Sequence, residues 1–115
     1  MPWVYDPHSG GTKIPPNIQE ELCKQADTYS RGRPWQPAIQ LKLRFKNQFC
    51  YIDTIEEGDD RLFPLCRLRY FNHRGVSLAL FSYAHERYEA SVMSNGKMEG
   101  TLEEALATCE YFIGV

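Results

Sequence analysis

The sequence predicts an α+β domain: a mostly antiparallel sheet of four to six strands, connected as a meander, with an N-terminal and a C-terminal helix on one face. Three observations lead to this prediction. Apolar residues recur at helical spacing from Ile18 to Tyr29 and then alternate strictly with polar residues from Ile39 to Lys46. Turn-forming residues separate the later apolar runs at short intervals, and a second helical pattern follows Thr101. We expect residues 1–115 to form one domain.

The N-terminal segment, residues 1–16, is rich in aromatic residues, proline and glycine, and we expect it to lie extended against the domain. A helix should begin at Asn17, because Pro15 and Pro16 prevent an earlier start and Asn17 with Glu20 resembles a capping box. The segment Arg-Gly-Arg-Pro at 31–34 should end this helix. Its core-facing residues would be Ile18, Leu22, Ala26 and Tyr29.

The middle of the chain has the period of two that is typical of half-buried strands. Pro64 suggests that one strand starts or lies at an edge there, a bend is expected at 85–87, and Asn95-Gly96 favours a hairpin turn. Thr101 and Glu104 form a second capping box, which predicts a C-terminal helix. The predicted strands are 39–46, 49–55, 65–71, 76–83, 88–93 and a short one within 97–100.

Composition and charge exclude several classes of protein. The chain is 43% hydrophobic and 24% charged, with no apolar run long enough to span a membrane, so a membrane protein, a collagen-like chain and a disulfide-dense toxin are all excluded. The formal net charge of −2 hides a segregated pattern. Residues 31–52 carry five basic and no acidic side chains, residues 53–60 five acidic and no basic, and residues 61–76 four basic and no acidic. Basic segments on both sides of an acidic turn keep an anionic partner in consideration.

The four cysteines have no metal-binding or redox spacing. No two of them form a Cys-x-x-Cys pair, so zinc-ribbon and thioredoxin-type sites are not expected, and no motif predicts a cofactor or a metal site. The N-terminus lacks the pattern of a secretory signal, so we expect a cytoplasmic protein with reduced thiols. Each cysteine lies in an apolar pattern and is expected to be a small buried hydrophobe. These residues are Cys23, Cys50, Cys66 and Cys109.

Alternation along the strands predicts a basic and aromatic face on the side away from the helices. If Leu41, Leu43, Leu68 and Leu78 face the core, the opposite face holds Lys42, Arg44, Arg67, Arg69, Phe81 and Tyr83. Cations neutralise phosphates and rings stack on bases, so we expect a non-catalytic binding module for an anionic partner: single-stranded nucleic acid, a phosphorylated ligand or an acidic protein. In the opposing interpretation this face is structural, with the arginines paired to acids and the rings packed under the N-terminal segment.

Two other classes of function are compatible with the sequence. A small enzyme or ligand-binding protein would use a pocket formed by His8, Cys50, Asp53, Tyr83 and His85, in which histidine beside a carboxylate could act as a base. No spacing in the sequence requires such a site, so we expect binding rather than catalysis. A homo-oligomer would use a sheet edge near Pro64 or the apolar end of the C-terminal helix, residues 109–113.

Several short motifs resemble a family of small bacterial proteins of uncharacterised function. They are Pro-Trp at 2–3, Tyr5, Pro-His-Ser-Gly-Gly at 7–11, Lys-Ile-Pro at 13–15, Phe-Cys-Tyr-Ile-Asp at 49–53 and Cys-Arg-Leu-Arg-Tyr at 66–70. The resemblance spans most of the chain, and the loop from Glu56 to Pro64 is shorter here. It implies no activity, ligand or fold. It suggests that the turn at 7–11 and the strand at 50–53 belong to one unit.

Overall fold

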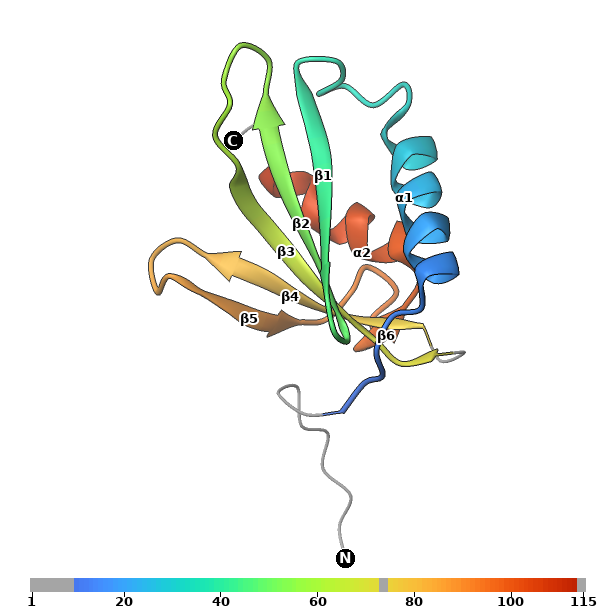
Figure 1. Cartoon of the computed structure of the whole chain (residues 1–115). Helices are drawn as coiled ribbons and strands as arrows, with labels where there is room; N and C mark the ends of the chain where they lie inside the picture. The colour runs from blue at the N-terminus through green and yellow to red at the C-terminus, as the bar shows by residue number, and fades with distance from the viewer. Residues whose placement is uncertain (1–9, 73–74, 114–115) are drawn as a thin grey trace, which may run out of the picture.

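The computed structural model describes residues 10–72 and 75–113 and has the predicted α+β arrangement (Figure 1). An N-terminal helix precedes an antiparallel meander, and a second helix follows it. In order, the elements are α1 (Pro16–Ser30), β1 (Ile39–Lys46), β2 (Phe49–Glu56), β3 (Phe63–Tyr70), β4 (Val76–Ser82), β5 (Arg87–Ser91), β6 (Glu99–Gly100), α2 (Leu102–Cys109) and the 3₁₀ turn η2 (Glu110–Phe112).

Helix α1 begins one residue before the predicted start, and the predicted Asn17–Glu20 capping box is absent. Pro15 is the N-cap, and no side chain caps the first turn. Proline is well suited to the first helical position because its fixed φ is already helical and the N–H that it lacks would have no partner there. The predicted core stripe is confirmed, with Leu22 and Ala26 buried and Tyr29 packed against the core.

The strands run in the order β1-β2-β3-β4-β5, and each pair of neighbours is antiparallel. The short β6 pairs with the first residues of β4, and β5 pairs with its later residues. Figure 1 shows the sheet twisting from the steep strands β1 to β3 into β4 and β5, which run across them. Strand β3 starts earlier than predicted, and Pro64 lies near its start, opposite Asp53, where the register with β2 shifts. Strand β4 ends at Ser82, one residue earlier than predicted, and the hydroxyl of Tyr83 donates to the carbonyl of Pro64 (2.7 Å).

Both helices contribute to a single core on one face of the sheet. Leu22 and Ala26 of α1 and Leu102, Ala105, Leu106 and Cys109 of α2 lie in one cluster with Cys50, Ile52, Cys66, Leu68 and Leu78. The Thr101–Glu104 capping box is confirmed, with both of its hydrogen bonds present. Cys50, Cys66 and Cys109 are buried as predicted. The prediction is wrong for Cys23, which is exposed because it follows Leu22 on α1 and lies outside the core stripe.

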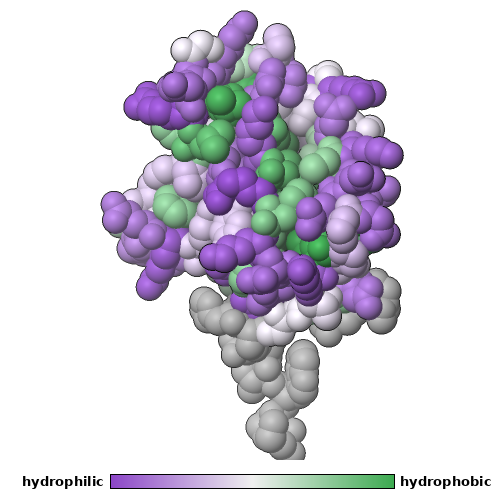
Figure 2. Space-filling model, in the orientation of Figure 1, coloured by the Kyte–Doolittle hydropathy of each residue, from purple (hydrophilic) through white to green (hydrophobic). Residues whose placement is uncertain are grey.

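The surface of the domain is mainly hydrophilic on the side that Figure 2 shows, with hydrophobic residues along the seam between α1 and β1. Leu41 and Leu43 of β1 line a smaller cavity of about 330 Å³ in this seam. Among the described residues, no helix is both long and apolar enough to cross a membrane.

The described part of the N-terminal segment lies against the ends of β2 and β3. Thr12 donates to the carbonyl of Tyr70 (2.9 Å), Ile14 donates to that of Asn47 (3.0 Å), and the Ile14 side chain is buried. The packing predicted for residues 1–16 is therefore observed for residues 10–14. The remainder of that prediction, including His8, lies outside the described residues.

The carboxylate of Glu110 links η2 to the end of α1 and to the segment that follows α1. Glu110 accepts hydrogen bonds from the Tyr29 hydroxyl (3.1 Å), the Trp35 indole (3.0 Å) and the Arg33 guanidinium. The Arg33 hydrogen bonds, with those of Trp35 and Tyr29, lower the pKa of Glu110 from 4.5 to about 2. The carboxylate therefore stabilises the fold only while it is ionised.

Glu110→Gln is expected to lower the free energy of unfolding near neutral pH by about 1–2 kcal/mol, because three donors lose a charged acceptor and Arg33 is partly screened by solvent. The folded pKa lies below the unfolded value, so this stabilisation is present above about pH 4.5 and is lost as the pH falls toward about 2. Melting temperatures of both proteins across this range should converge at the acid end. A constant difference at every pH would contradict this assignment.

Candidate functional site

The register of the sheet places five of the six predicted face residues on the side away from the helices, and Tyr83, which follows β4, packs against Phe81. The alternation in β1 to β4 sends Leu43, Ile52, Cys66 and Leu80 to the core and their neighbours to the other face. Arg44, Tyr51, Arg67 and Ala79 form one row across four strands. We call this surface the arginine–aromatic face and define it as Lys42, Arg44, Lys46, Phe49, Tyr51, Asp53, Arg67, Arg69, Phe81, Tyr83 and Tyr88.

Five rings on this face form a continuous chain. The ring centroids are 6.0 Å apart for Phe49 and Tyr51, 5.5 Å for Tyr51 and Tyr88, 5.1 Å for Tyr88 and Phe81, and 4.9 Å for Phe81 and Tyr83. Tyr51 and Tyr88 meet although β3 and β4 lie between their strands, because the small side chain of Ala79 leaves room above β4. The last three contacts are edge-to-face, a favourable geometry for aromatic pairs.

Arg67 lies over this ring chain, and the described residues provide it with no carboxylate partner. Its guanidinium carbon is 4.4 Å from the Phe49 ring centre and 5.2 Å from that of Tyr88, which are cation–π distances. Within residues 10–72 and 75–113, no carboxylate lies at ion-pair distance from Arg67. Among the described residues its charge therefore faces aromatic rings and no acid, an arrangement that suits an external anion.

Arg44 is held differently, by a buried acid. Its Nε donates to Oδ2 of Asp53 (2.8 Å), and its guanidinium carbon is 4.8 Å from the Tyr51 ring centre. The hydrogen bond to Asp53 raises the pKa of Arg44. Asp53 is only 1% exposed, whereas the Arg44 side chain is 52% exposed, so the arginine side chain remains half-exposed to solvent.

Arg69 is the one predicted face residue that is buried, at 4% exposure. Its guanidinium carbon is 5.1 Å from the Phe49 ring centre. The backbone of Gly11 passes so close that a Cβ there would lie 2.9 Å from Cγ of Arg69. The N-terminal segment therefore covers this end of the face, which leaves Lys42, Arg44, Arg67, Phe81 and Tyr83 as the accessible part of the predicted set.

Three rings of the face were not among the predicted site residues. Phe49 and Tyr51 lie in β2, and the alternation of that strand was sufficient to place them beside Arg67. Tyr88 pairs with Phe81 across the β4–β5 hairpin. The length of that hairpin's turn decides which residue faces Phe81, so the position of Tyr88 could be determined only from the structure.

The described residues of the alternative pocket do not all come together. Cys50 points into the core between the sheet and the helices, whereas Asp53 lies on the opposite face in its ion pair with Arg44. Burial raises the pKa of Cys50 to about 12, so it stays a protonated thiol near neutral pH. Tyr83 and His85 are exposed near the β4–β5 turn, with His85 Nδ1 at 3.0 Å from the Glu89 carboxylate, and His8 lies outside the described residues.

The described residues contain no cluster of three or more histidine, cysteine, aspartate or glutamate side chains that could hold a metal ion. Fold and surface together define a small α+β domain with an arginine–aromatic sheet face. No protein-family model, no curated protein and no solved structure matches the chain.

Proposed function

We propose that the chain is a non-catalytic binding module that holds single-stranded nucleic acid on its arginine–aromatic face. The observation that carries the proposal is Arg67, a cation stacked on two rings with no carboxylate partner among the described residues. Single-stranded nucleic acid offers the two complementary groups, phosphates for cations and flat bases for rings and guanidinium planes.

The charge around Arg67 supports this choice of partner. Lys42 and Lys46 of β1 are exposed on the same face, and Arg44 is half-exposed beside them. Asp53, the acidic residue of the defined face, is buried and already paired. The face is therefore locally positive although the whole chain carries a net charge of −2. A local basic stripe of this kind attracts a polyanion even on an acidic protein.

The ring chain supports nucleic acid over an acidic protein. An acidic peptide needs cations alone, whereas Tyr51, Tyr88 and Phe81 add partly exposed π surface between and beside the cations. Each base stacked on such a surface contributes about 1–3 kcal/mol, which makes binding tolerant of sequence.

Fluorescence anisotropy of a short labelled oligonucleotide, RNA and DNA in parallel, tests this proposal at low and moderate salt. We expect binding that weakens as salt rises, because phosphate contacts release counterions. The double variant Arg67→Gln with Lys42→Gln should lose about tenfold or more in affinity and flatten the salt dependence by about one unit per lost contact.

The matched control removes the same charge from another surface. Arg31 and Lys24 are exposed on or beside α1, so Arg31→Gln with Lys24→Gln should change affinity less than about threefold by long-range charge alone. Equal losses in both double variants, or no binding of the wild type at low salt, would overturn the proposal. Tight binding of polyglutamate together with no binding of the oligonucleotide would indicate an acidic protein partner instead.

A further inference from the structure

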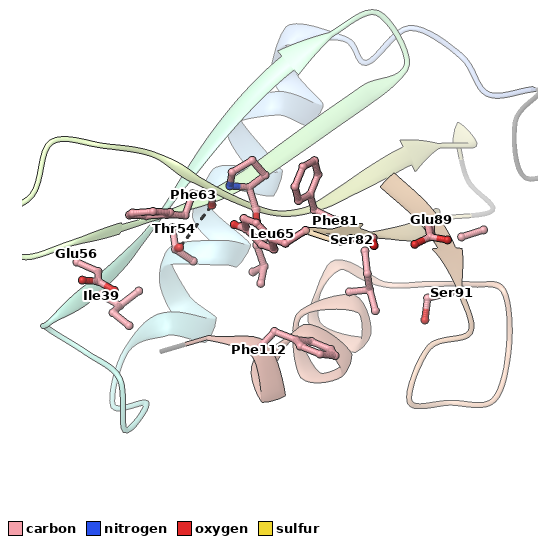
Figure 3. Close-up of a pocket in the computed structure, with 14 residues that line it drawn as sticks. Ile39, Thr54, Glu56, Phe63, Leu65, Phe81, Ser82, Glu89, Ser91 and Phe112 are labelled. Carbon is pink, nitrogen blue, oxygen red and sulfur yellow. Dashed lines mark hydrogen bonds between the residues drawn. The ribbon is translucent and has the colours of Figure 1, made fainter. Parts of the chain in front are cut away.

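A trough with a volume of about 750 Å³ opens on the face of the sheet that bears the helices, beyond the area that the helices cover (Figure 3). The twist that turns β4 and β5 across β1 to β3 (Figure 1) leaves this part of the sheet without a helix above it. All five main strands contribute to it, through residues such as Ile39, Thr54, Phe63, Leu80 and Ser91, and Phe112 of η2 forms the opposite wall. This volume lies within the range of ordinary small-molecule sites, about 300–1,000 Å³.

The middle of the trough is apolar. Leu65 and Leu80 lie on the strands, and Phe63 and Phe112 contribute rings. Phe112 is 58% exposed although it is a large hydrophobic residue, and Figure 3 shows it across the trough from Phe63 and Leu65. A ligand with an apolar body would cover this surface, and the removal of apolar area from water would favour its binding.

The charged side chains that line the trough are all acidic, and Glu89 also has the His85 ring at 3.0 Å and the Arg87 guanidinium at 3.8 Å beside the trough. Its lining includes the carboxylates of Glu56 and Glu89, and no lysine, arginine or histidine is among the described residues that line it. Figure 3 shows these two glutamates at opposite ends. The hydrogen bond from His85 lowers the pKa of Glu89, so this carboxylate is ionised at neutral pH. Aromatic rings also attract cations through their faces, which reinforces the preference.

We propose that this trough binds a small amphipathic organic cation. Its apolar body would lie over Leu65 and Leu80 against Phe112, and its ammonium group would meet the carboxylate of Glu89 or of Glu56. Hydroxyl groups of Thr54, Ser82 and Ser91 line the same trough and offer hydrogen bonds to a polar substituent. An anionic ligand of the same shape would be rejected, because its charge would face two carboxylates with no cation in the lining.

This inference does not rest on the proposed nucleic-acid function. Arg67 does not line the trough, and of the five rings of the chain only Phe81 and Tyr83 reach its lining. Loss of oligonucleotide binding would leave the trough proposal intact, and the reverse also holds. Variants at residues that belong to one site only keep the two proposals separate: Arg67→Gln should weaken only the oligonucleotide, and Glu56→Gln only the amine.

The test uses two probes with the same body and opposite charge, phenylbutylamine and phenylbutyrate, titrated into the full chain by isothermal calorimetry and by NMR chemical-shift mapping. We expect the amine to bind at least about tenfold more tightly than the acid and to shift signals of residues on β2, β3, β5 and η2. Equal affinities, shifts spread over the whole surface, or no binding of the amine would overturn the proposal.

Three variants locate the site. Glu89→Gln or Glu56→Gln should lower the affinity for the amine at least about fivefold. Glu103 is an exposed glutamate of α2 outside the trough, so Glu103→Gln should leave that affinity unchanged. Ser91 lies on the short strand β5 and lines the trough, so Ser91→Phe would place a phenyl ring inside it. This variant should abolish binding of the amine while its circular dichroism spectrum stays native. Unchanged affinity in both trough glutamate variants and in Ser91→Phe would contradict the proposal.

Discussion

Arg44→Met is expected to lower the free energy of unfolding by about 2–3 kcal/mol, because it leaves the carboxylate of Asp53 buried without its cation. Asp53 is 1% exposed, and Arg44 donates to both of its oxygens, at 2.8 Å and 3.4 Å. Methionine keeps much of the arginine's apolar stem over Tyr51, so the change removes mainly the charge and the hydrogen bonds. Since the Arg44 side chain is 52% exposed, the loss stays below that of a fully buried pair.

Urea unfolding of wild type, Arg44→Met and Lys42→Met measures this effect. Lys42 lies on the same strand and face and is the cross-strand neighbour of Asp53, but the described residues provide it with no ion pair. Lys42→Met should therefore change stability by no more than about 0.5 kcal/mol. Equal effects of the two variants would show that the Arg44–Asp53 hydrogen bonds contribute nothing beyond surface charge.

A double-variant cycle separates the energy of the Arg44–Asp53 ion pair from that of the packing of Arg44. In an Asp53→Asn background the carboxylate is already gone, so adding Arg44→Met should cost clearly less than it does in the wild type. Because Arg44 also belongs to the arginine–aromatic face, the same proteins connect stability to function. Lys42→Met should weaken only the proposed binding, whereas Arg44→Met should weaken both the proposed binding and stability.

The sequence could predict most of the strands because each half-buried strand alternates with a period of two. The run from Ile39 to Lys46 alternates without interruption, and β1 has those bounds in the structure. The same alternation is sufficient to place Lys42, Arg44 and Arg67 on one face. Local patterns of this kind depend only on which side of a strand meets the core, which the identity of each residue already indicates.

Features that depend on contacts between distant segments could not be predicted in this way. The burial of Arg69 results from the passage of Gly11 over β3, and two segments about sixty residues apart in the sequence meet there. The trough depends on the twist of the sheet and on the position of Phe112, neither of which leaves a periodic signal. The start of β3 was predicted too late, because Pro64 is tolerated where the register shifts and the Tyr83 hydroxyl bonds its carbonyl.

The two proposed sites share one structural cause, the order of strands around β4. Phe81 and Tyr83 belong to the ring chain and also line the trough, and Leu80 and Ser82 line the trough beside them. The position of β4 is fixed along its first residues by β6 and along its later residues by β5. A change that displaces β6 should therefore disturb the fold more than its two residues suggest, because the N-cap of α2 follows directly at Thr101.

Gly75→Ala tests this connection and is expected to destabilise the protein by about 2–4 kcal/mol. Gly75 has a φ of +96°, and a Cβ at this position would lie 2.5 Å from the carbonyl oxygen of Gly100 in β6. The obstacle is backbone, so no side-chain rotation can relieve it. We expect β6 to separate from the start of β4, which would also displace Thr101 and the first turn of α2.

Gly58→Ala is the matched control for backbone strain. Gly58 has a φ of +83°, but a Cβ there would have no neighbour within 4 Å, so alanine should cost only about 1 kcal/mol. Urea unfolding of both variants and amide hydrogen exchange of α2 separate the effect of backbone strain from that of the steric clash with Gly100. Only Gly75→Ala should accelerate exchange in the first turn of α2, because only Gly75 lies against β6. Equal stability losses with unchanged exchange in α2 would mean that β6 accommodates the methyl group and does not fix the position of β4.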